Sequence, residues 1–313
     1  MTARKIIIDT DPGQDDAVAI LLALASPDEL DVVAITTVAG NVPLVLTTRN
    51  ALMMCELAGR TDVAVHAGSV RPMVRDLVTA EYVHGASGID GADLAEPTMA
   101  VAGGHAVDAI IEIIMSGKLG EITICPLGPL TNVGLALVRE PRIAERLREI
   151  VLMGGGFFEG GNRTPAAEFN IYVDPHAADV VLRSGVPITM MPLDVTHKAL
   201  TSPERLARFA EIDSAAGRAV RGMLGFFERF DIERYGTQGG PLHDPCVIAY
   251  LLEPNLFGGK HVPVRIETES ELTMGMTVVD WWGATDDAPN ATVMRQIDAD
   301  GFFELLADRI ARL

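Results

Sequence analysis

The stretch that decides the fold is IIIDTDPGQDD, residues 6–16, in which an apolar run ends in four aspartates around a Pro-Gly pair. Its β-branched start predicts a buried strand, and the apolar positions of 15–26 recur at helical spacing. Pro-Gly supplies the turn between the two segments. A strand that passes through a tight turn into a helix is the repeating unit of parallel α/β sheets.

The same alternation continues along the chain. Further strands are predicted over 30–38, 62–68, 121–128, 149–156 and 187–194, and helices over 43–58, 105–117 and 175–185. Toward the C-terminus, helices are predicted over 202–235, 246–254 and 302–313, and strands within 261–281. We therefore expect an α/β fold: an open, mostly parallel (mixed) sheet with helices on both faces, in a single domain covering residues 1–313.

Composition narrows the class of protein. The net charge of -18, from 43 acidic and 25 basic side chains, argues against binding to nucleic acid or to an anionic membrane surface. No uncharged apolar stretch reaches the length of about 18 residues that a membrane span needs. The three cysteines lie far apart without a Cys-x-x-Cys motif, which predicts reduced thiols and a cytoplasmic protein.

The four aspartates allow two kinds of site. Asp15 and Asp16 suit the N-terminal dipole of a helix, but Asp9 and Asp11 fall two apart on the same side of an extended segment. Clustered carboxylates favour a divalent cation, and an oxygen-only ligand set suits Ca²⁺ or Mg²⁺. A phosphohydrolase in which Asp9 is the nucleophile of a strand-ending Asp-x-Asp is the second interpretation.

Other polar or glycine-rich positions also follow predicted strands, where ligands collect in sheets of this kind. They are Asn41, Leu127-Gly128, the MGGG segment at 153–156 and Asp194. Within GGNRTPAAEFNIYVDP (160–175), Glu168 and Asn170 lie two apart on a predicted extended segment, six or more residues after Asn162. Two amides and a carboxylate on one rim can hydrogen-bond several sugar hydroxyls.

Candidate residues farther along the chain could complete the site. Asp244 precedes Pro245 and could cap a helix, or it could complete the metal shell that 9–16 leaves open. His243 beside it offers a proton donor near neutral pH. His84, in the glycine-rich VHGASGIDG (83–91), could cover a site or be structural, and Tyr235 could reach a planar ligand.

Together these segments resemble the nucleoside hydrolase family, the inosine-uridine-preferring group, over essentially the whole chain. The resemblance rests on DTDPGQDD (9–16), TTVAGN (36–41), HGASG (84–88), PLGPLTN (126–132), MGGG (153–156), N-x₅-E-F-N (162–170) and HDP (243–245). It implies a nucleoside-hydrolase-type fold and an enzyme that hydrolyses the N-glycosidic bond of ribonucleosides to ribose and free base.

The resemblance also implies roles for individual residues. Ca²⁺ would be held by Asp11, Asp16, Asp244 and the backbone carbonyl of Leu127, and Asp11 would be the general base toward a metal-bound water. His243 would assist the leaving base, with His84 and Tyr235 near the nucleobase and Met153 against the sugar. The ribose would be held by Asp15, Asn41, Asn162, Glu168, Asn170 and Asp244.

Attack by water from the face opposite the base would invert the anomeric carbon. A homodimer or homotetramer and a function in purine or pyrimidine salvage are implied by the resemblance as well. Two alternatives remain: a Mg²⁺-dependent phosphatase that uses Asp9, and a nucleoside- or sugar-binding protein without turnover. The sequence leaves the base preference open.

Overall fold

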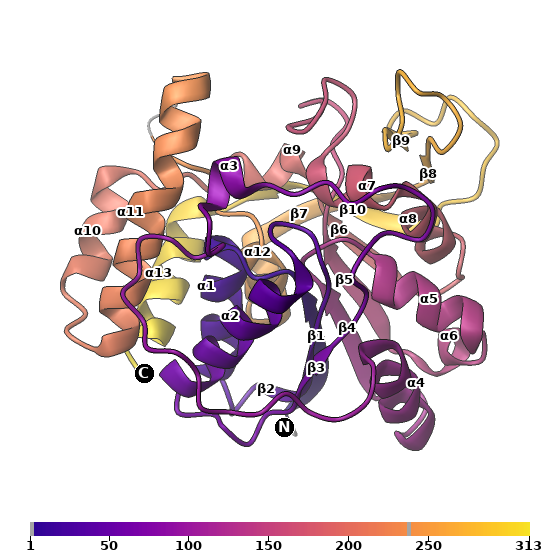
Figure 1. Cartoon of the computed structure of the whole chain (residues 1–313). Coiled ribbons are helices and arrows are strands. Elements are labelled where there is room, and N and C mark those ends of the chain that lie inside the picture. The colour runs from indigo at the N-terminus through magenta and orange to yellow at the C-terminus, as the bar shows by residue number, and fades with distance from the viewer. Residues whose placement is uncertain (1–2, 237–238) are drawn as a thin grey trace.

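The chain forms an eight-stranded sheet whose strands lie side by side in the order β3-β2-β1-β4-β5-β6-β10-β7 (Figure 1). The structure is a computed structural model that describes residues 3–236 and 239–313, apart from the side chains of Asp231 and Tyr235. All neighbouring strands of this sheet are parallel except the antiparallel pair β10–β7. The predicted open, mostly parallel (mixed) sheet in a single-domain α/β fold is therefore confirmed.

The strands are short and mostly buried. Those of the main sheet are β1 (Arg4–Thr10), β2 (Leu30–Thr37), β3 (Val65–Ala67), β4 (Ile122–Pro126), β5 (Glu149–Met153), β6 (Ile188–Met191), β7 (Phe257–Val262) and β10 (Ala291–Ile297). A separate antiparallel pair consists of β8 (Val264–Ile266) and β9 (Thr277–Val279).

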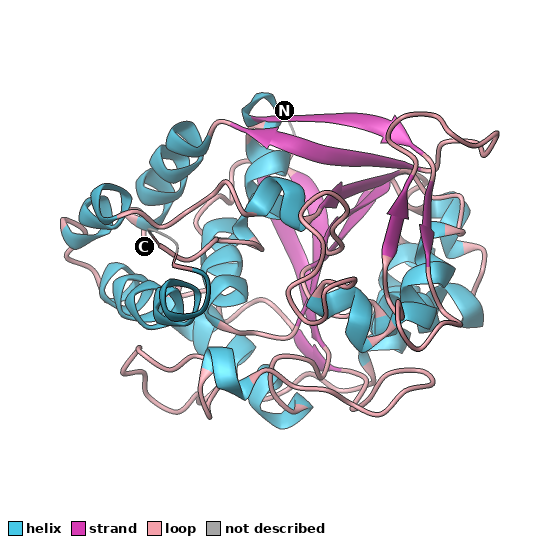
Figure 2. Ribbon diagram, turned by 90° about the horizontal axis from the view of Figure 1, so that it is seen from above, coloured by secondary structure: helices cyan, strands magenta, loops and turns pink. Residues whose placement is uncertain are grey.

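Helices cover both faces of the sheet, as the view in Figure 2 shows. One face carries α1 (Gln14–Leu24), α2 (Leu44–Leu57), α10 (Pro203–Ala210), α11 (Ala215–Tyr235), α12 (Pro245–Leu252) and α13 (Ala299–Ile310). The other carries α4 (Ala106–Ser116), α5 (Thr131–Arg139), α6 (Ile143–Arg146) and α8 (Pro175–Leu182). The remaining short elements are α3 (Glu81–His84), α7 (Phe169–Val173), α9 (Leu193–Thr196) and the 3₁₀ turn η1 (Pro254–Leu256).

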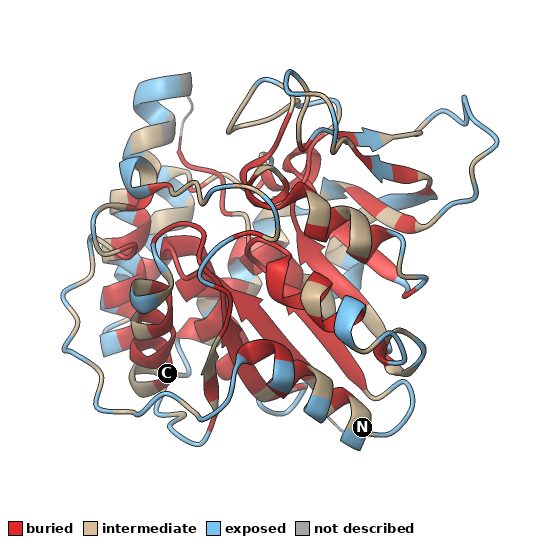
Figure 3. Ribbon diagram, turned by 45° about the vertical axis from the view of Figure 1, so that its right-hand side comes forward, coloured by how far each residue is buried: buried red, intermediate tan, exposed pale blue. Residues whose placement is uncertain are grey.

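The isoleucine run of β1 explains why the sheet is buried on both sides. Ile6 and Ile8 belong to the core on the α1 face, whereas Ile7 belongs to the core on the α4 face. This division follows from the two-residue period of a strand. All three side chains are fully buried, and the buried centre of the sheet is visible in Figure 3.

Helix α1 is the central helix of its layer. Every residue from Gln14 to Leu24 is buried, and the helix packs against α2, α11 and α12. Gly13 is its N-cap, and the carboxylate of Asp16 accepts the backbone N–H of Gly13 at 3.0 Å. The predicted role of Asp16 at the helix start is thus confirmed for Oδ2. Its other oxygen, Oδ1, accepts from the hydroxyl of Thr10 and from the backbone N–H of Asp11.

The strand order reverses direction at β1. Strands β2 and β3 lie on one side of β1, and β4, β5 and β6 lie on the other. The loops that leave the carboxyl ends of β1 and β4 therefore diverge, and a crevice opens between them. None of the helices within the described ranges combines the length and apolar character that crossing a membrane requires.

The sequence-based prediction is wrong in the C-terminal part of the sheet. Strands were expected only within 261–281, and β10, which lies between β6 and β7, was not predicted. Only Ala291, Val293 and Met294 of β10 are buried, so its apolar pattern is weak. Pairing with strands on both sides, rather than local propensity, makes this segment extended. The predicted strand 62–68 is reduced to the three residues of β3.

Candidate active site

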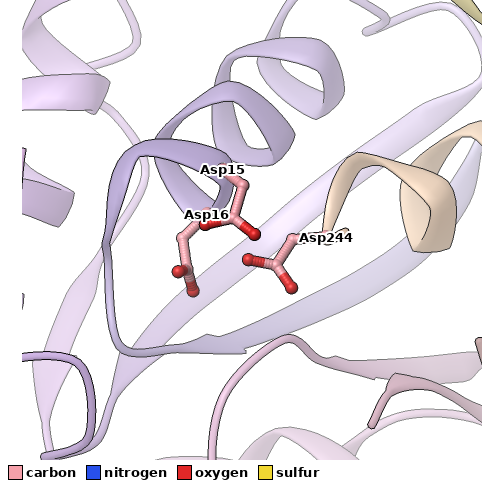
Figure 4. Close-up of side chains that lie close together, drawn as sticks. All are labelled: Asp15, Asp16 and Asp244. Atoms are coloured by element: carbon pink, nitrogen blue, oxygen red, sulfur yellow. The ribbon is translucent and has the colours of Figure 1, made fainter. Parts of the chain in front are cut away.

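Three carboxylates meet at the carboxyl end of the sheet (Figure 4). Asp15 and Asp16 come from the first turn of α1, and Asp244 precedes α12. One oxygen from each lies within 4.8 Å of the others, and all three residues are buried. The contact between α1 and α12 brings these residues together from opposite ends of the chain.

The backbone at Asp244 decides between its two predicted roles. Asp244 occupies the N-cap position of α12, but its φ of -67° and ψ of -36° are helical and its carboxylate accepts no capping hydrogen bond. An effective N-cap has an extended backbone that turns the side chain toward the first helical N–H groups. The carboxylate of Asp244 is instead turned toward Asp15 and Asp16, so helix capping does not explain it.

The carboxylate of Asp11 packs against Gly40 and Gly128, where a larger residue would collide with it. A Cβ atom on Gly40 would lie 2.0 Å from Oδ2 of Asp11, and one on Gly128 would lie 2.1 Å from Oδ1. Oδ2 accepts the backbone N–H of Asn41 at 2.7 Å. Oδ1 is buried and has no hydrogen-bond partner among the described residues. A buried carboxylate oxygen without a donor is suited to a cation.

The electrostatics of the cluster also favour a cation. Burial, reinforced by repulsion from Asp16, raises the pKa of Asp11 well above its usual range and that of Asp15 to about 7. Burial and repulsion from Asp15 raise the pKa of Asp244 in the same direction. A divalent cation would compensate both the lost hydration and the repulsion. This oxygen-only donor set fits Ca²⁺ or Mg²⁺.

A cavity of about 440 Å³ opens above the carboxylates. Its walls include ten of the residues singled out from the sequence: Asp15, Asn41, His84, Leu127, Met153, Asn162, Glu168, Asn170, His243 and Asp244. Asp11 and Asp16 are fully buried and do not line the cavity. Asp16 groups with the lining residues Asp15 and Asp244, whereas Asp11 is outside that group and interacts with it electrostatically. The predicted contact through Tyr235 lies outside the described residues, because that side chain is not among them.

Glu168 and Asn170 converge on the cavity, but not through the extended segment that was expected. Glu168 is the N-cap of α7, and its carboxylate accepts the N–H groups of Asn170, Ile171 and Gly155 at 2.9, 3.2 and 3.0 Å. Asn170 lies in the first turn of that helix and donates from Nδ2 to the carbonyl of Leu127 at 2.6 Å. Burial raises the pKa of Glu168 to about 6.

Histidine and aromatic side chains form the other end of the cavity. The ring of His84 stacks on Phe227 with 5.6 Å between centroids, and the edge of Phe227 meets His243 at 6.5 Å. Phe227 and Phe230 lie three positions apart on α11, and both line the cavity. Sequence reasoning assigned these phenylalanines to the core by default, because helical spacing cannot distinguish a core face from a cavity wall.

Asp194 anchors a loop and does not line the cavity. Its carboxylate accepts the backbone N–H groups of Phe157, Phe158 and Glu159 at 2.9, 2.9 and 3.2 Å. These residues belong to the loop after β5, which also carries Asn162 to the cavity wall. Asp194, the polar residue predicted after β6, therefore stabilises the loop that forms part of the cavity wall.

Buried carboxylates under a small cavity, at the reversal point of a parallel sheet, define an α/β enzyme that acts on a small polar molecule. Residues 6–304 match the sequence model of the inosine-uridine preferring nucleoside hydrolase family. The chain belongs to this family, which confirms the resemblance noted from its motifs.

Relatives and solved structures agree with this assignment. The chain is 49% identical over 309 residues to an Escherichia coli protein named pyrimidine-specific ribonucleoside hydrolase RihA, with 98% of each chain covered. A protein of the same name from Photobacterium profundum is 46% identical, with 99% of each chain covered.

Two solved structures superpose on nearly the whole chain. A plant nucleoside hydrolase has a TM-score of 0.90 and 34% identity, and covers 98% of this chain with 99% of its own. A purine-preferring ribonucleoside hydrolase from Gardnerella vaginalis has a TM-score of 0.91 and 31% identity, with 98% of each chain covered. The chain is therefore an enzyme, a ribonucleoside hydrolase.

Replacing Asp194 by alanine is expected to raise KM for a ribonucleoside several-fold and to lower the free energy of unfolding by about 1–2 kcal/mol, since three N–H groups lose their acceptor. Initial rates and urea unfolding check both effects. Asp179→Ala, which removes the exposed ion pair with Arg183, is the control and should change neither measurably. An unchanged KM in Asp194→Ala would refute the anchoring role.

Proposed function

We propose that this enzyme is a Ca²⁺-dependent hydrolase of pyrimidine ribonucleosides that releases ribose and the free base. The observation that carries the proposal is the buried carboxylate group of Asp15, Asp16 and Asp244 beneath a cavity lined by polar side chains. The buried carboxylate of Asp11 interacts electrostatically with Asp15 and Asp16. The pyrimidine preference is supported by the names of the relatives at 46–49% identity.

Four oxygen donors would hold the ion. They are carboxylate oxygens of Asp11, Asp16 and Asp244 and the carbonyl oxygen of Leu127, which has a second lone pair beyond the one that Asn170 uses. The unpartnered Oδ1 of Asp11 supports its membership of this set. When bound, Ca²⁺ supplies positive charge that lowers the pKa of water and neutralises the carboxylates.

Asp11 has the properties of the general base. Its carboxylate is buried and is held in one orientation by the N–H of Asn41, which donates to Oδ2. Oδ1 has no donor among the described residues, so its lone pairs are available to the ion and to a proton from water. Water that loses its proton to Asp11 attacks from the floor of the cavity, opposite the departing base, so the product is inverted ribose.

The remaining polar groups bind the ribose and the charge that develops on it. Asp15, Asn41, Asn162, Glu168, Asn170 and Asp244 would hydrogen-bond the hydroxyls, and Met153 would pack against the ring. Cleavage of an N-glycosidic bond passes through an oxocarbenium-like sugar. Fixed carboxylates around the ring stabilise this positive charge without reorganising.

His243 is the group that would assist the leaving base. Its Nδ1 lies 2.8 Å from the hydroxyl of Thr196, which can donate to it and leave Nε2–H for the cavity. Burial lowers the pKa of His243, and the neighbouring His197 lowers it further. The neutral imidazole then donates a hydrogen bond to a base that leaves with negative charge.

The surroundings of Asp9 argue against the phosphatase alternative. Asp9 and Asp11 are both fully buried and neither lines the cavity, but their surroundings differ. Burial alone raises the pKa of Asp9 to about 7, whereas repulsion from Asp16 and Asp15 adds to the effect of burial on the pKa of Asp11. Oδ1 of Asp9 accepts hydrogen bonds from Thr36 at 2.6 Å and from Asn132 at 2.8 Å, which connects β1 to β2 and to the first turn of α5.

One assay tests the proposal against both alternatives. Purified protein is incubated with uridine, cytidine, inosine and uridine monophosphate, with Ca²⁺ or with a chelator, and free ribose and phosphate are measured. We expect ribose from uridine and cytidine, at least about tenfold faster in kcat/KM than from inosine, and no phosphate. Asp9→Asn should retain turnover. Phosphate release that Asp9→Asn abolishes would establish the phosphatase, and tight nucleoside binding without ribose would establish the binder.

A further inference from the structure

Gln14, inside the aspartate motif, connects α1 to the segment that carries His84. Its side chain is fully buried. The amide nitrogen Nε2 donates to the carbonyl oxygens of His84 at 2.9 Å and of Asp90 at 3.1 Å. The amide oxygen Oε1 lies 2.7 Å from Nδ1 of the His84 ring.

These three contacts determine which ring nitrogen of His84 carries the proton. Backbone carbonyls only accept hydrogen bonds, so the amide nitrogen of Gln14 must face them, and the amide cannot be flipped. Oε1 then faces Nδ1 and can only accept, which requires Nδ1 to carry hydrogen. Burial lowers the pKa of His84 to about 4, so the ring is neutral near pH 7 and its Nε2 carries a lone pair.

The free nitrogen of His84 faces the cavity. A Cβ atom on Gly13 would lie 2.4 Å from Nδ1 and 2.7 Å from Cε1, so this edge of the ring is packed against the α1 loop. Phe227 covers one face of the ring. Nε2 has no hydrogen-bond partner among the described residues, is not sealed from solvent, and belongs to a residue that lines the cavity.

We infer that Gln14 is a positioning residue that holds His84 in the Nδ1–H tautomer, so that Nε2 of His84 accepts a hydrogen bond from an N–H group of the nucleobase. The inference rests on the proposed function for the identity of the ligand. It gives the two histidines opposite roles: His243 donates to the base, and His84 accepts from it. The ligands favoured at this position are bases with a ring or amino N–H on the edge that faces His84, such as N3–H of uracil.

Asn50 offers a matched control for Gln14. Its buried amide donates to the carbonyls of Pro12 at 3.0 Å and of Ser87 at 2.8 Å, and so joins the same two loops. Within the described part of the chain, the hydrogen bonds of the Asn50 side chain go to Arg49, Pro12 and Ser87, and none reaches the His84 ring. Asn50→Ala therefore loosens the loops as Gln14→Met does, but it leaves the acceptor at Nδ1 in place.

The tautomer is tested by ¹⁵N–¹H correlation spectra of the histidine rings in the full-length protein, with His84→Asn to assign the signal. We expect a single Nδ1–H form in the wild type and in Asn50→Ala, and a shift toward Nε2–H in Gln14→Met. An Nε2–H form in the wild type, an unchanged signal in Gln14→Met, or the same change in Asn50→Ala would overturn the inference. This measurement of the tautomer does not require turnover. Absence of ribose release would refute the proposed function, whereas a wrong tautomer would refute the role of Gln14, so the two failures can be distinguished.

The role toward the base is tested with 3-deazauridine, in which C–H replaces N3–H, as a competitor of uridine. The wild type and Asn50→Ala should bind 3-deazauridine about tenfold more weakly than uridine, because one hydrogen bond is lost. The ratio of the two dissociation constants should fall to about one in Gln14→Met and His84→Phe. A ratio near one in the wild type, or a ratio that survives in His84→Phe, would refute the contact between Nε2 and the base.

Discussion

Asp11→Asn is expected to lower kcat for ribose release by about 10²–10⁴-fold while the protein stays folded. Asparagine has the shape of aspartate and keeps an oxygen that can accept the N–H of Asn41, so the packing between Gly40 and Gly128 is preserved. It cannot take a proton from water. The rate is measured with saturating Ca²⁺, and folding is checked by circular dichroism and thermal unfolding.

Asp9→Asn provides the matched control, because it makes the same chemical change in a buried carboxylate two residues away. The oxygen that accepts from Thr36 and Asn132 is kept, and we expect nearly wild-type rates. Wild-type turnover in Asp11→Asn would disprove the assignment of the base. If turnover returned only at high Ca²⁺ and calorimetry showed weakened ion binding, Asp11 would be a ligand alone.

Removal of divalent ions is expected to abolish turnover and to make stability depend on pH. In the ion-free protein burial raises the pKa of Asp15 from 3.8 to about 7, and it raises the pKa values of the proposed ligands Asp11 and Asp244 in the same direction. A folded-state pKa above the unfolded value gives stability that is present below pH 3.8 and is lost as the pH rises through 7. The ion-free protein should therefore unfold more easily at pH 8 than at pH 5.5.

Calcium should reverse this trend, because it binds the deprotonated carboxylates. At a free Ca²⁺ concentration of 100 times Kd, a site that exists only in the folded state stabilises it by about 2.7 kcal/mol. Thermal unfolding at both pH values, with Ca²⁺ or with a chelator, measures the effect. Equal stabilisation at pH 5.5 and pH 8, or full activity after chelation, would contradict a carboxylate calcium site.

The layers of the fold were predictable because the buried strands are marked in the sequence. The run Ile6–Ile8 buries both faces of β1, so its strand character is visible without knowledge of any partner. Strand β10 lacks such an apolar run, and its conformation depends on pairing with β6 and β7 beside it. Local sequence identifies an element when the element's own residues decide its structure, and fails when neighbours decide it.

The site was predictable to a similar extent and for a similar reason. The aspartates of 9–16 are grouped in sequence, so their chemistry was apparent at once. The backbone of Asp244, the capping geometry of Glu168 and the tautomer imposed by Gln14 depend on contacts between distant segments. No pattern of residue types records those contacts, and so the role of Gln14 could not be found from the sequence.

The packing of α1 against α12 has a consequence for how the molecule matures. Asp16 and Asp244 belong to the first and last quarters of the polypeptide, and only the docking of these two helices brings them together. A nascent or truncated chain that lacks α12 has only part of the carboxylate group and should gain little stability from a divalent cation. We therefore expect affinity for the ion to arise late in synthesis, so that the ion stabilises completed molecules over unfinished ones.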